Sequence, residues 1–507
     1  MIARLLILSC FLFLSCSLSA QLNALQRVEL ELPFAIKGER VLSLEENGAL
    51  LSHFEQGEST NRKRWTFQAF DQDLNAQQAL SFFLPKSFIQ QSATYDPLTQ
   101  QSHHLFVNRQ KDFKLFTFQW PSGQVEEIQD AIPVGRSIQR MMVHENLIYF
   151  VSRQRGRDHL WTLHTQTREK AIIPFQHPNY PANKTRIQKM EVLEADQTVL
   201  VFAHALVDDK PNASFLGEFQ NNRPKTIQAI NIGRRLEAEN LTAFKTGEND
   251  FLLSTSYAQH RNSKSEGIAL FNLQDQKVQN IQFHSYGGML EFFSYLPAER
   301  QERIGKRKLK KQKKGKEFIR RYEVITHPLL KVDDGYLVLG EAFYRTEDCY
   351  MIGDLMVSDF DGYQYTHAFI LKVDEAGNKL WDQSFPMWPS YRPMTKKRFI
   401  QVETTVGNQI RLVYANRNQL ESKVLDKNGQ VLDDKRITPL RGQYNDDEIR
   451  RTLSYLSYWH DDHFLSHGFQ RIVNTNLAPG ERRRRVYYLE KWQFKAEDYL
   501  KETDSSR

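Results

Sequence analysis

The chain has few cysteines, with three among 507 residues. Cys10 and Cys16 belong to the first twenty residues, and Cys349 is the third. Without that leader a single thiol is left, and one thiol cannot form an internal disulfide. The mature fold must therefore be stabilised by a hydrophobic core. Cys349 follows Glu347 and Asp348, whose charge disfavours a thiolate, so we interpret it as structural or incidental rather than as a nucleophile.

Long hydrophobic runs are also scarce, and no run after the leader is long enough to cross a bilayer. The leader "MIARLLILSCFLFLSCSLSAQ" carries Arg4, an apolar stretch through Leu14 and then small residues. This layout is typical of a secretory signal peptide over residues 1–20, cleaved between Ala20 and Gln21. "FLSC", ending at Cys16, is loosely similar to a bacterial lipobox, in which the cysteine is acylated. We expect export to the periplasm or outer membrane, as a soluble protein or as a lipoprotein.

Motifs that carry chemistry are missing as well. The sequence has no phosphate-binding loop and no nucleophile elbow. "WHDDHFLSHGF" contains His460, His463 and His467, which on a helix would be spaced for zinc. The segment aligns with strand positions elsewhere in the chain, so Asp461 and Asp462 are expected to form a turn. His463 and His467 would then lie two pleats apart, and we predict no metal, no cofactor and no catalytic residue.

A repeat is what the chain does have. Ile-Gln pairs begin at residues 89, 138 and 187, a spacing of 49 residues each time. A period of this length predicts a propeller or a solenoid. Short apolar strands follow each pair, and turns such as "DEAGN" and "DKNGQ" supply the glycine that a tight hairpin needs. Each unit is interpreted as four antiparallel strands.

The alternation of side chains within the strands indicates how the units are stacked. In "AFILKVD", Phe369, Leu371 and Val373 point to one side, while Ala368 and Ile370 point to the other. Strands that are apolar on both faces are buried on both faces. This is the pattern expected for blades sandwiched between neighbouring blades of a β-propeller.

We count eight units, which begin near residues 39, 87, 136, 185, 238, 321, 397 and 451. The last unit lacks a fourth strand, and "RVELELPF" from Arg27 can supply it and close the ring. The prediction is an all-β fold, a single β-propeller domain over residues 21–507 with four-stranded blades. Eight blades are favoured, and seven blades are the alternative.

The first of two insertions spans about residues 286–320. Leu290, Phe293 and Leu296 have helical spacing, so we expect an amphipathic helix that leads into a lysine-rich loop. The run from residue 304 to 316 holds eight cations and no acid. These form the predicted basic arm: Lys306, Arg307, Lys308, Lys310, Lys311, Lys313, Lys314 and Lys316.

Two interpretations of the basic arm are open. It is either a solvated loop without a partner, or a docking segment for an envelope protein or an anionic membrane or glycan surface. Nucleic acid is not expected, because the run contains no aromatic side chain for base stacking.

The second insertion, about residues 343–366, reads "YRTEDCYMIGDLMVSDFDGYQYTH" with its flanks. Carboxylates among aromatic residues can bind a cation or a sugar, although the spacing of a calcium loop is absent. The candidate ligand-binding loop comprises Asp354, Asp359, Asp361, Tyr363 and His367. An ordinary acidic surface loop is the other interpretation.

The span "GYLVLGEAFYR…FDGYQYTHAFILKVDEAGNKLWDQSF", with the helix and basic run before it, resembles uncharacterised exported β-propeller-like proteins of Bacteroidota over about residues 288–385. The resemblance implies an envelope propeller and brings no known activity. "GNKLWDQSF" is similar to the Trp motif of quinoproteins, but it occurs once, at Trp381, so no quinone cofactor is expected. The predicted function is a non-catalytic scaffold for protein or membrane-surface interactions in the cell envelope. A propeller that binds or degrades glycans is the alternative.

Overall fold

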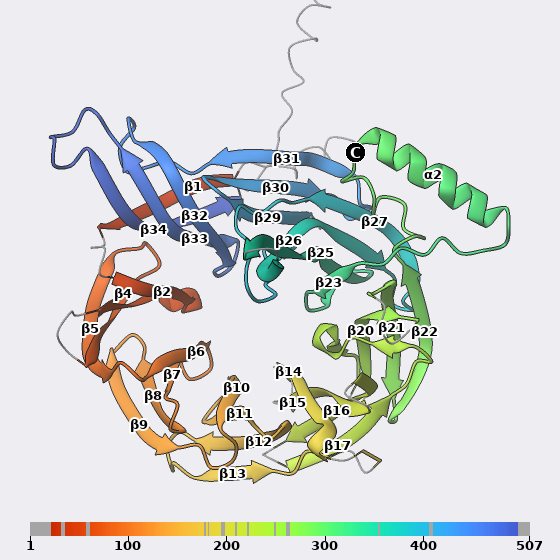
Figure 1. The fold of residues 1–507 in the computed structure, drawn as a ribbon, viewed down its shortest axis with the longest axis horizontal. Coiled ribbons are helices and arrows are strands. Elements are labelled where there is room, and N and C mark those ends of the chain that lie inside the picture. The colour runs from red at the N-terminus through yellow and green to blue at the C-terminus, as the bar shows by residue number, and fades with distance from the viewer. Residues whose placement is uncertain are drawn as a thin grey trace, which may run out of the picture.

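The computed structural model describes residues 22–31, 36–56, 61–176, 179–180, 182–193, 198–207, 210–220, 223–247, 250–259, 264–352, 355–404 and 409–494. These residues form eight antiparallel sheets arranged in a ring (Figure 1). No helix within these ranges is long and apolar enough to span a bilayer. The predicted leader and Cys16 lie outside the described residues.

Each sheet is one blade, and the blades follow one another along the chain. Blades one to four contain β2 (Ile36–Ser43), β3 (Ala49–Gln56), β4 (Arg62–Phe70) and β5 (Ala76–Pro85); β6 (Ile89–Asp96), β7 (Gln101–Val107), β8 (Asp112–Gln119) and β9 (Gln124–Ala131); β10 (Ser137–His144), β11 (Leu147–Gln154), β12 (Arg157–His164) and β13 (Lys170–Ile173); β14 (Thr185–Leu193), β15 (Thr198–Val207), β16 (Lys210–Gln220) and β17 (Arg223–Ile230).

Blades five to eight contain β18 (Arg235–Leu236), β19 (Thr242–Lys245), β20 (Phe251–Ala258), β21 (Gly267–Gln274) and β22 (Lys277–Ser285); β23 (Glu323–Thr326), β24 (Leu330–Val332), β25 (Gly335–Ile352), β26 (Leu355–Val373) and β27 (Lys379–Pro386); β28 (Gln401–Thr404), β29 (Ile410–Asn416), β30 (Gln419–Leu425) and β31 (Val431–Pro439); β32 (Glu448–Tyr458), β33 (His463–Val473), β34 (Arg483–Phe494) and β1 (Leu22–Glu31). The described helices are η1 (Glu45–Asn47), η2 (Ala182–Lys184), η3 (Ala238–Asn240) and α2 (Ala298–Gln312).

The prediction of an eight-bladed propeller is confirmed. The first strand of each blade lies nearest the centre of the ring and the fourth lies at its rim (Figure 1). Because successive strands are antiparallel, their turns alternate between the two ends of the ring. We call the end where first strands turn into second strands the A–B face. The opposite end, where second strands turn into third strands, is the B–C face.

The first strand of the chain closes the ring, as predicted. β1 pairs antiparallel with β34, from Leu22 opposite Phe494 to Glu31 opposite Val486. It thereby becomes the fourth strand of blade eight, whose other three strands come from the C-terminal part of the chain. This pairing protects an edge of β34 that would otherwise be open.

The core is divided among the seams between blades. Eight clusters of buried apolar side chains occur in the described part of the chain, and each joins two neighbouring blades. Phe369, Leu371 and Val373 lie in the cluster between blades five and six. Ala368 and Ile370 lie in the cluster between blades six and seven, so the predicted two-sided burial is confirmed. Each such side chain contributes roughly 1.5–3 kcal/mol of transfer free energy, so the seams hold the ring together.

The first insertion differs from its prediction. The helix expected around Leu290, Phe293 and Leu296 begins only after Pro297, and the eight preceding residues form turns. A residue before proline is disfavoured in the α region, which prevents a helix from running through Leu296. Phe293 instead packs into the seam between blades five and six. The cations expected in a loop therefore begin on a helix, α2.

The second insertion is not the loop that we expected. β25 and β26 continue past the rest of blade six as a paired hairpin, with Met351 opposite Met356 near its tip. Alternating aromatic and β-branched residues suit this extended arm. Because it extends the turn between second and third strands, the hairpin projects from the B–C face.

Candidate functional site

The basic arm lies on the second half of α2 and in the turn after it, outside the ring beside blade six (Figure 1). Seven of its eight cations are exposed, and Lys308 is half-buried. Lys308 Nζ donates to the carbonyl oxygen of Met289 at 3.3 Å, and burial followed by the charge of Lys379 lowers the pKa of Lys308. In the described part of the chain, one acid pairs with the arm: Glu302 Oε1 lies 2.6 Å from Lys306 Nζ.

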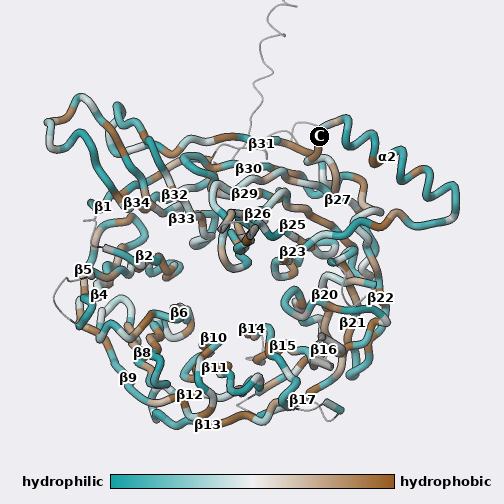
Figure 2. The backbone as a smooth tube through the Cα atoms, viewed as in Figure 1, coloured by the Kyte–Doolittle hydropathy of each residue, from teal (hydrophilic) through white to brown (hydrophobic). Residues whose placement is uncertain are grey.

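The cations of α2 gather on one flank and on the outer side of the helix. Ile304 is the side chain that contacts the core, and it marks the inner side of the helix. At 3.6 residues per turn, Lys306 and Lys310 lie away from that inner side, whereas Lys308 lies near it and is held against the ring. The opposite flank, which includes Gly305 and Leu309, carries no cation. Figure 2 shows α2 as a largely hydrophilic coil, and its positive flank is open to a partner.

The base of the arm is held firmly against blade six. Asp382 on β27 accepts hydrogen bonds from the backbone N–H groups of Leu290 (3.0 Å) and Glu291 (2.7 Å). Lys379 Nζ lies 2.9 Å from the same carboxylate, whose side chain is 1% exposed. A buried carboxylate with three charge-assisted contacts fixes its donors in place. The turns before α2 are thus rigidly positioned.

His367, a predicted ligand residue, belongs to this anchor. Its ring stacks on Tyr295 at a centroid distance of 3.7 Å and meets the edge of Phe292 at 4.7 Å. The side chain is fully buried, and that burial lowers the pKa of His367 to about 3. A neutral imidazole enclosed by aromatic rings packs the insertion onto the blade and cannot reach a ligand on the hairpin.

The other predicted ligand residues do not come together. Asp359 accepts a hydrogen bond from Tyr350 Oη at 2.7 Å, Asp361 pairs with Arg392, and Tyr363 packs on Phe343. Asp359 and His367 lie on one strand, about 26 Å apart at 3.3 Å per residue. Asp354 lies outside the described residues.

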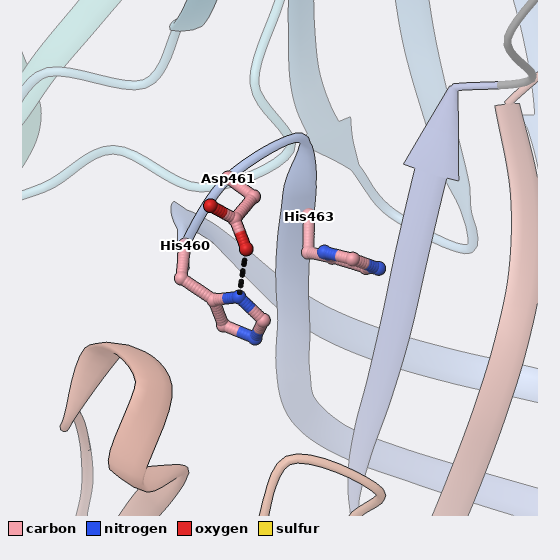
Figure 3. A group of neighbouring side chains, drawn as sticks. All are labelled: His460, Asp461 and His463. Atoms are coloured by element: carbon pink, nitrogen blue, oxygen red, sulfur yellow. Dashed lines mark hydrogen bonds and ion pairs between the residues drawn. The ribbon is translucent and has the colours of Figure 1, made fainter.

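The histidine-rich turn brings together a group that strand spacing did not indicate. His460, Asp461 and His463 have ligand atoms within 4.8 Å of one another (Figure 3). β33 begins at His463, as predicted, and His467 is half-buried with its Nδ1 2.8 Å from Tyr487 Oη. Ligands of one zinc ion lie about 3.4 Å apart, so this group would have to contract to bind one. As it stands, His460 Nδ1 lies 3.2 Å from Asp461 Oδ2.

Two carboxylates from different blades lie near this turn. Glu403 is on β28 of blade seven, and Asp462 is in the turn of blade eight. Burial raises the pKa of Glu403 to about 7, Arg411 opposes this rise, and Asp462 adds to it. Each acid has a partner: Glu403 Oε2 lies 3.6 Å from Arg411 Nη1, and Asp462 Oδ2 accepts from Gln493 Nε2 at 2.8 Å. The cavity of about 820 Å³ on this A–B face is lined by residues of blades one, two, three, four and eight, among them the carboxylates Glu45, Glu46, Asp96 and Asp461, but not by Glu403.

A third carboxylate, Glu341 of β25, is completely buried and saturated with donors. It accepts from the backbone N–H groups of Phe399 and Ile400, both at 2.9 Å, and from His327 Nε2 at 2.8 Å. These contacts fix the segment that leads into blade seven. We therefore assign Glu341 a structural role.

Comparison with known proteins assigns no family to this chain. No family model and no curated protein matches the sequence. Among solved structures, the Dos1 propeller is 9% identical, with a TM-score of 0.42 over 93% of this chain and 95% of that one. The WD40 domain of SCAP from fission yeast is 9% identical, with a TM-score of 0.41 over 93% and 98%. The β-propeller domain of the Trilobed protease from Pyrococcus furiosus is 9% identical, with a TM-score of 0.34 over 82% and 97%. The ring of eight sheets defines this chain as a β-propeller protein.

Proposed function

We propose that this propeller is a non-catalytic interaction scaffold of the cell envelope, and that α2 docks it to an acidic protein. The observation that carries the proposal is a rigidly based helix whose exposed cations gather on one flank and its outer side, with Glu302 as the acid that contacts the basic arm. A basic surface of this kind attracts negatively charged partners and accelerates their association. The leader pattern of residues 1–20 supports export, and the sequence resemblance supports an envelope location.

A protein partner is favoured over a membrane because α2 has little exposed apolar surface. Its outer side offers one apolar side chain, Leu309, which is 58% exposed. Interfacial helices instead bury a wide apolar face. An acidic protein surface can contact Lys306, Arg307 and Lys310 together.

The glycan-degrading alternative depends on Glu403 and Asp462, since carboxylates from two blades are what a glycosidase requires. Both are engaged by their own partners, and Glu403 does not line the A–B cavity. Of the carboxylates that do line it, Asp96 accepts hydrogen bonds within its own turn, from the backbone N–H of Leu98 and from Thr99 Oγ1, and Asp461 contacts His460. The scaffold is therefore the better proposal.

The test reverses four charges of the arm: Lys306→Glu, Arg307→Glu, Lys310→Glu and Lys313→Glu together. The control reverses four exposed cations of other blades, Arg109, Arg155, Arg157 and Lys277, which keeps the change in net charge equal. Tagged mature protein and both variants are used to capture partners from crosslinked envelopes, and the captured protein is then purified for a binding titration at low and high salt.

The expected result is one acidic partner that binds the wild type and the control, is lost with the arm variant, and binds more weakly as salt rises. Equal capture by both variants would refute docking through α2. Binding of the wild type to vesicles of anionic lipid, with no protein partner, would replace the acidic protein by a membrane surface.

A further inference from the structure

An arginine-lined cavity lies on the B–C face between blades seven and eight. Its volume is about 660 Å³. Its walls come from the start of β32, the end of β33, the start of β34 and the turn between β29 and β30. Ser390 and Tyr391, from the segment that joins blades six and seven, complete it. The size is typical of cavities that hold a small molecule.

All the charged side chains that line this cavity have the same sign. They are five arginines from four segments of the chain: Arg417, Arg450, Arg451, Arg471 and Arg485. No aspartate or glutamate is among the described lining residues. Positive charge concentrated in a concave surface repels itself and raises the local concentration of anions.

Most of these arginines lack a partner within the protein. The side chains of Arg417, Arg451 and Arg471 make no hydrogen bond or ion pair in the part of the chain that the structure describes. Arg450 Nη2 lies 2.6 Å from Glu448 Oε2, an exposed contact that solvent weakens. Arg485 lies 5.2 Å above the ring of Phe469, and Glu39 is within electrostatic range of it.

The positive region continues from the cavity toward the centre of the ring. Tyr391 lies 5.4 Å from the ring of Tyr455, and Lys397 Nζ lies 5.3 Å from that same ring. Burial lowers the pKa of Lys397, and the charge of Arg40 on blade one lowers it further. No carboxylate in the described residues lies within ion-pair distance of Lys397 or Arg40. Lys397 and Arg40 thus extend the positive charge from the cavity toward blade one, where Glu39 is the carboxylate nearby.

The chemistry of the cavity identifies the class of ligand. A guanidinium presents two parallel N–H donors that match a carboxylate, a sulfate or a phosphate, and several of them match a ligand with more than one such group. Tyr391 and Phe469 add flat apolar surface to which a ring can stack. We propose that the arginine cavity binds a small polyanion that carries two or more carboxylate, sulfate or phosphate groups, of about the size of one or two sugar rings.

Titration calorimetry on the full mature protein tests this. The probes are a sulfated uronic-acid disaccharide, inorganic pyrophosphate and citrate, with cellobiose as the neutral control. Arg451→Gln and Arg471→Gln are each expected to weaken binding of the preferred probe about tenfold or more, since each removes a charge-assisted contact. Arg155→Gln, an exposed arginine of blade three, is the matched control and should bind like the wild type. The arm variant should also bind like the wild type, which separates this site from the docking proposal.

Stability without ligand gives a second readout. A binding site that holds unpaired like charges is destabilising, so Arg451→Gln and Arg471→Gln should leave the melting temperature unchanged or raise it. Three results would overturn the proposal: no binding of any anionic probe at millimolar concentration, equal binding of cellobiose, or variants that bind like the wild type. A loss of stability in both variants would assign these arginines a structural role instead. Preference for the disaccharide or for pyrophosphate identifies the ligand as an acidic glycan or a phosphate compound.

Discussion

Replacing Arg27 by alanine is expected to weaken the closure of the ring. Arg27 lies on β1 and donates from Nη2 to Glu29 Oε1 at 2.8 Å and from Nη1 to Glu490 Oε2 at 3.2 Å. The side chains of Glu29 and Glu490 are 2% and 3% exposed. Arg484 Nη1 also lies 2.8 Å from Glu29 Oε2, so Glu29 keeps a cation after the change, whereas Glu490 loses its own.

The size of the effect follows from the buried charge that the change leaves behind. Removing one partner of a buried ion pair costs about 3–5 kcal/mol of unfolding free energy. Burial raises the pKa of Glu490 to about 7, and the charge and hydrogen bond of Arg27 keep it from rising further. Without Arg27 the carboxyl holds its proton to higher pH. A carboxyl whose pKa is raised in the folded protein costs stability once the pH is high enough to ionise it in the unfolded chain, and the cost grows until the pH passes the folded pKa. The variant has the higher folded pKa, so the free energy of unfolding that it loses relative to the wild type should be larger at about pH 8 than at about pH 6.

The assay is urea unfolding of the mature protein at both pH values. Arg27→Lys keeps the charge but not the fork geometry, and is expected to lose less than Arg27→Ala. Adding Glu490→Gln to Arg27→Ala should recover much of the loss at the higher pH, because the buried carboxylate that lost its partner is then replaced by a neutral amide. Lys331→Ala is the control: its Nζ lies 2.7 Å from Glu375 Oε1, but the side chains are 36% and 73% exposed, so it should cost below about 1 kcal/mol.

The reasoning fails if Arg27→Ala costs no more than Lys331→Ala. It also fails if the cost is the same at both pH values, because the pH dependence follows directly from the carboxyl of Glu490.

Three further predictions concern other parts of the ring. Gly287→Ala should cost roughly 1–3 kcal/mol of unfolding free energy, because the new Cβ would lie 1.6 Å from the carbonyl oxygen of Phe318 at the base of the insertion. Thermal melting checks this, with Gly305→Ala as the control, since a Cβ at Gly305 has no atom within 4 Å. Trp459→Phe removes the Nε1–H donor to the carbonyl oxygen of Gly48 (2.8 Å) across the seam between blades eight and one, and should cost about 1 kcal/mol in urea unfolding. Acidification from about pH 7 to about pH 5 should destabilise the protein. Several histidines bind a proton in this range when the chain is unfolded, but stay neutral when the chain is folded. Burial lowers the pKa of these histidines to about 3 or 4: His103, His104, His204, His367 and His467. The raised pKa values of Glu39, Glu237, Glu403 and Glu490 act in the opposite direction, but the histidines with lowered pKa values are more numerous. Unfolding free energy that stays constant or rises on acidification would contradict this prediction.

The blades could be predicted because their pattern is local. A strand is recognised from side chains two residues apart, and a blade from strands joined by short turns. Phe369 and Ile370 were thereby assigned to opposite faces, and the structure places them in the clusters on either side of blade six. The closing role of β1 followed from counting strands, since blade eight was one strand short.

The insertions were predicted less well, because their structure depends on contacts with the ring. Leu290, Phe293 and Leu296 have helical spacing, yet Pro297 and the anchoring carboxylate of Asp382 hold them in turns. The candidate ligand residues of the second insertion shared a short segment of sequence. A hairpin separates residues along its length, and His367 lies in the aromatic anchor of the first insertion instead.

Period, strand alternation and charge runs therefore establish the fold, its closure and the basic arm from sequence alone, because each arises from residues close together in the chain. The arginine cavity is different. Arg417, Arg451 and Arg485 belong to separate strands and turns, and no spacing in the sequence relates them. They converge because blades seven and eight pack at a fixed angle in a closed ring, which only the tertiary structure determines.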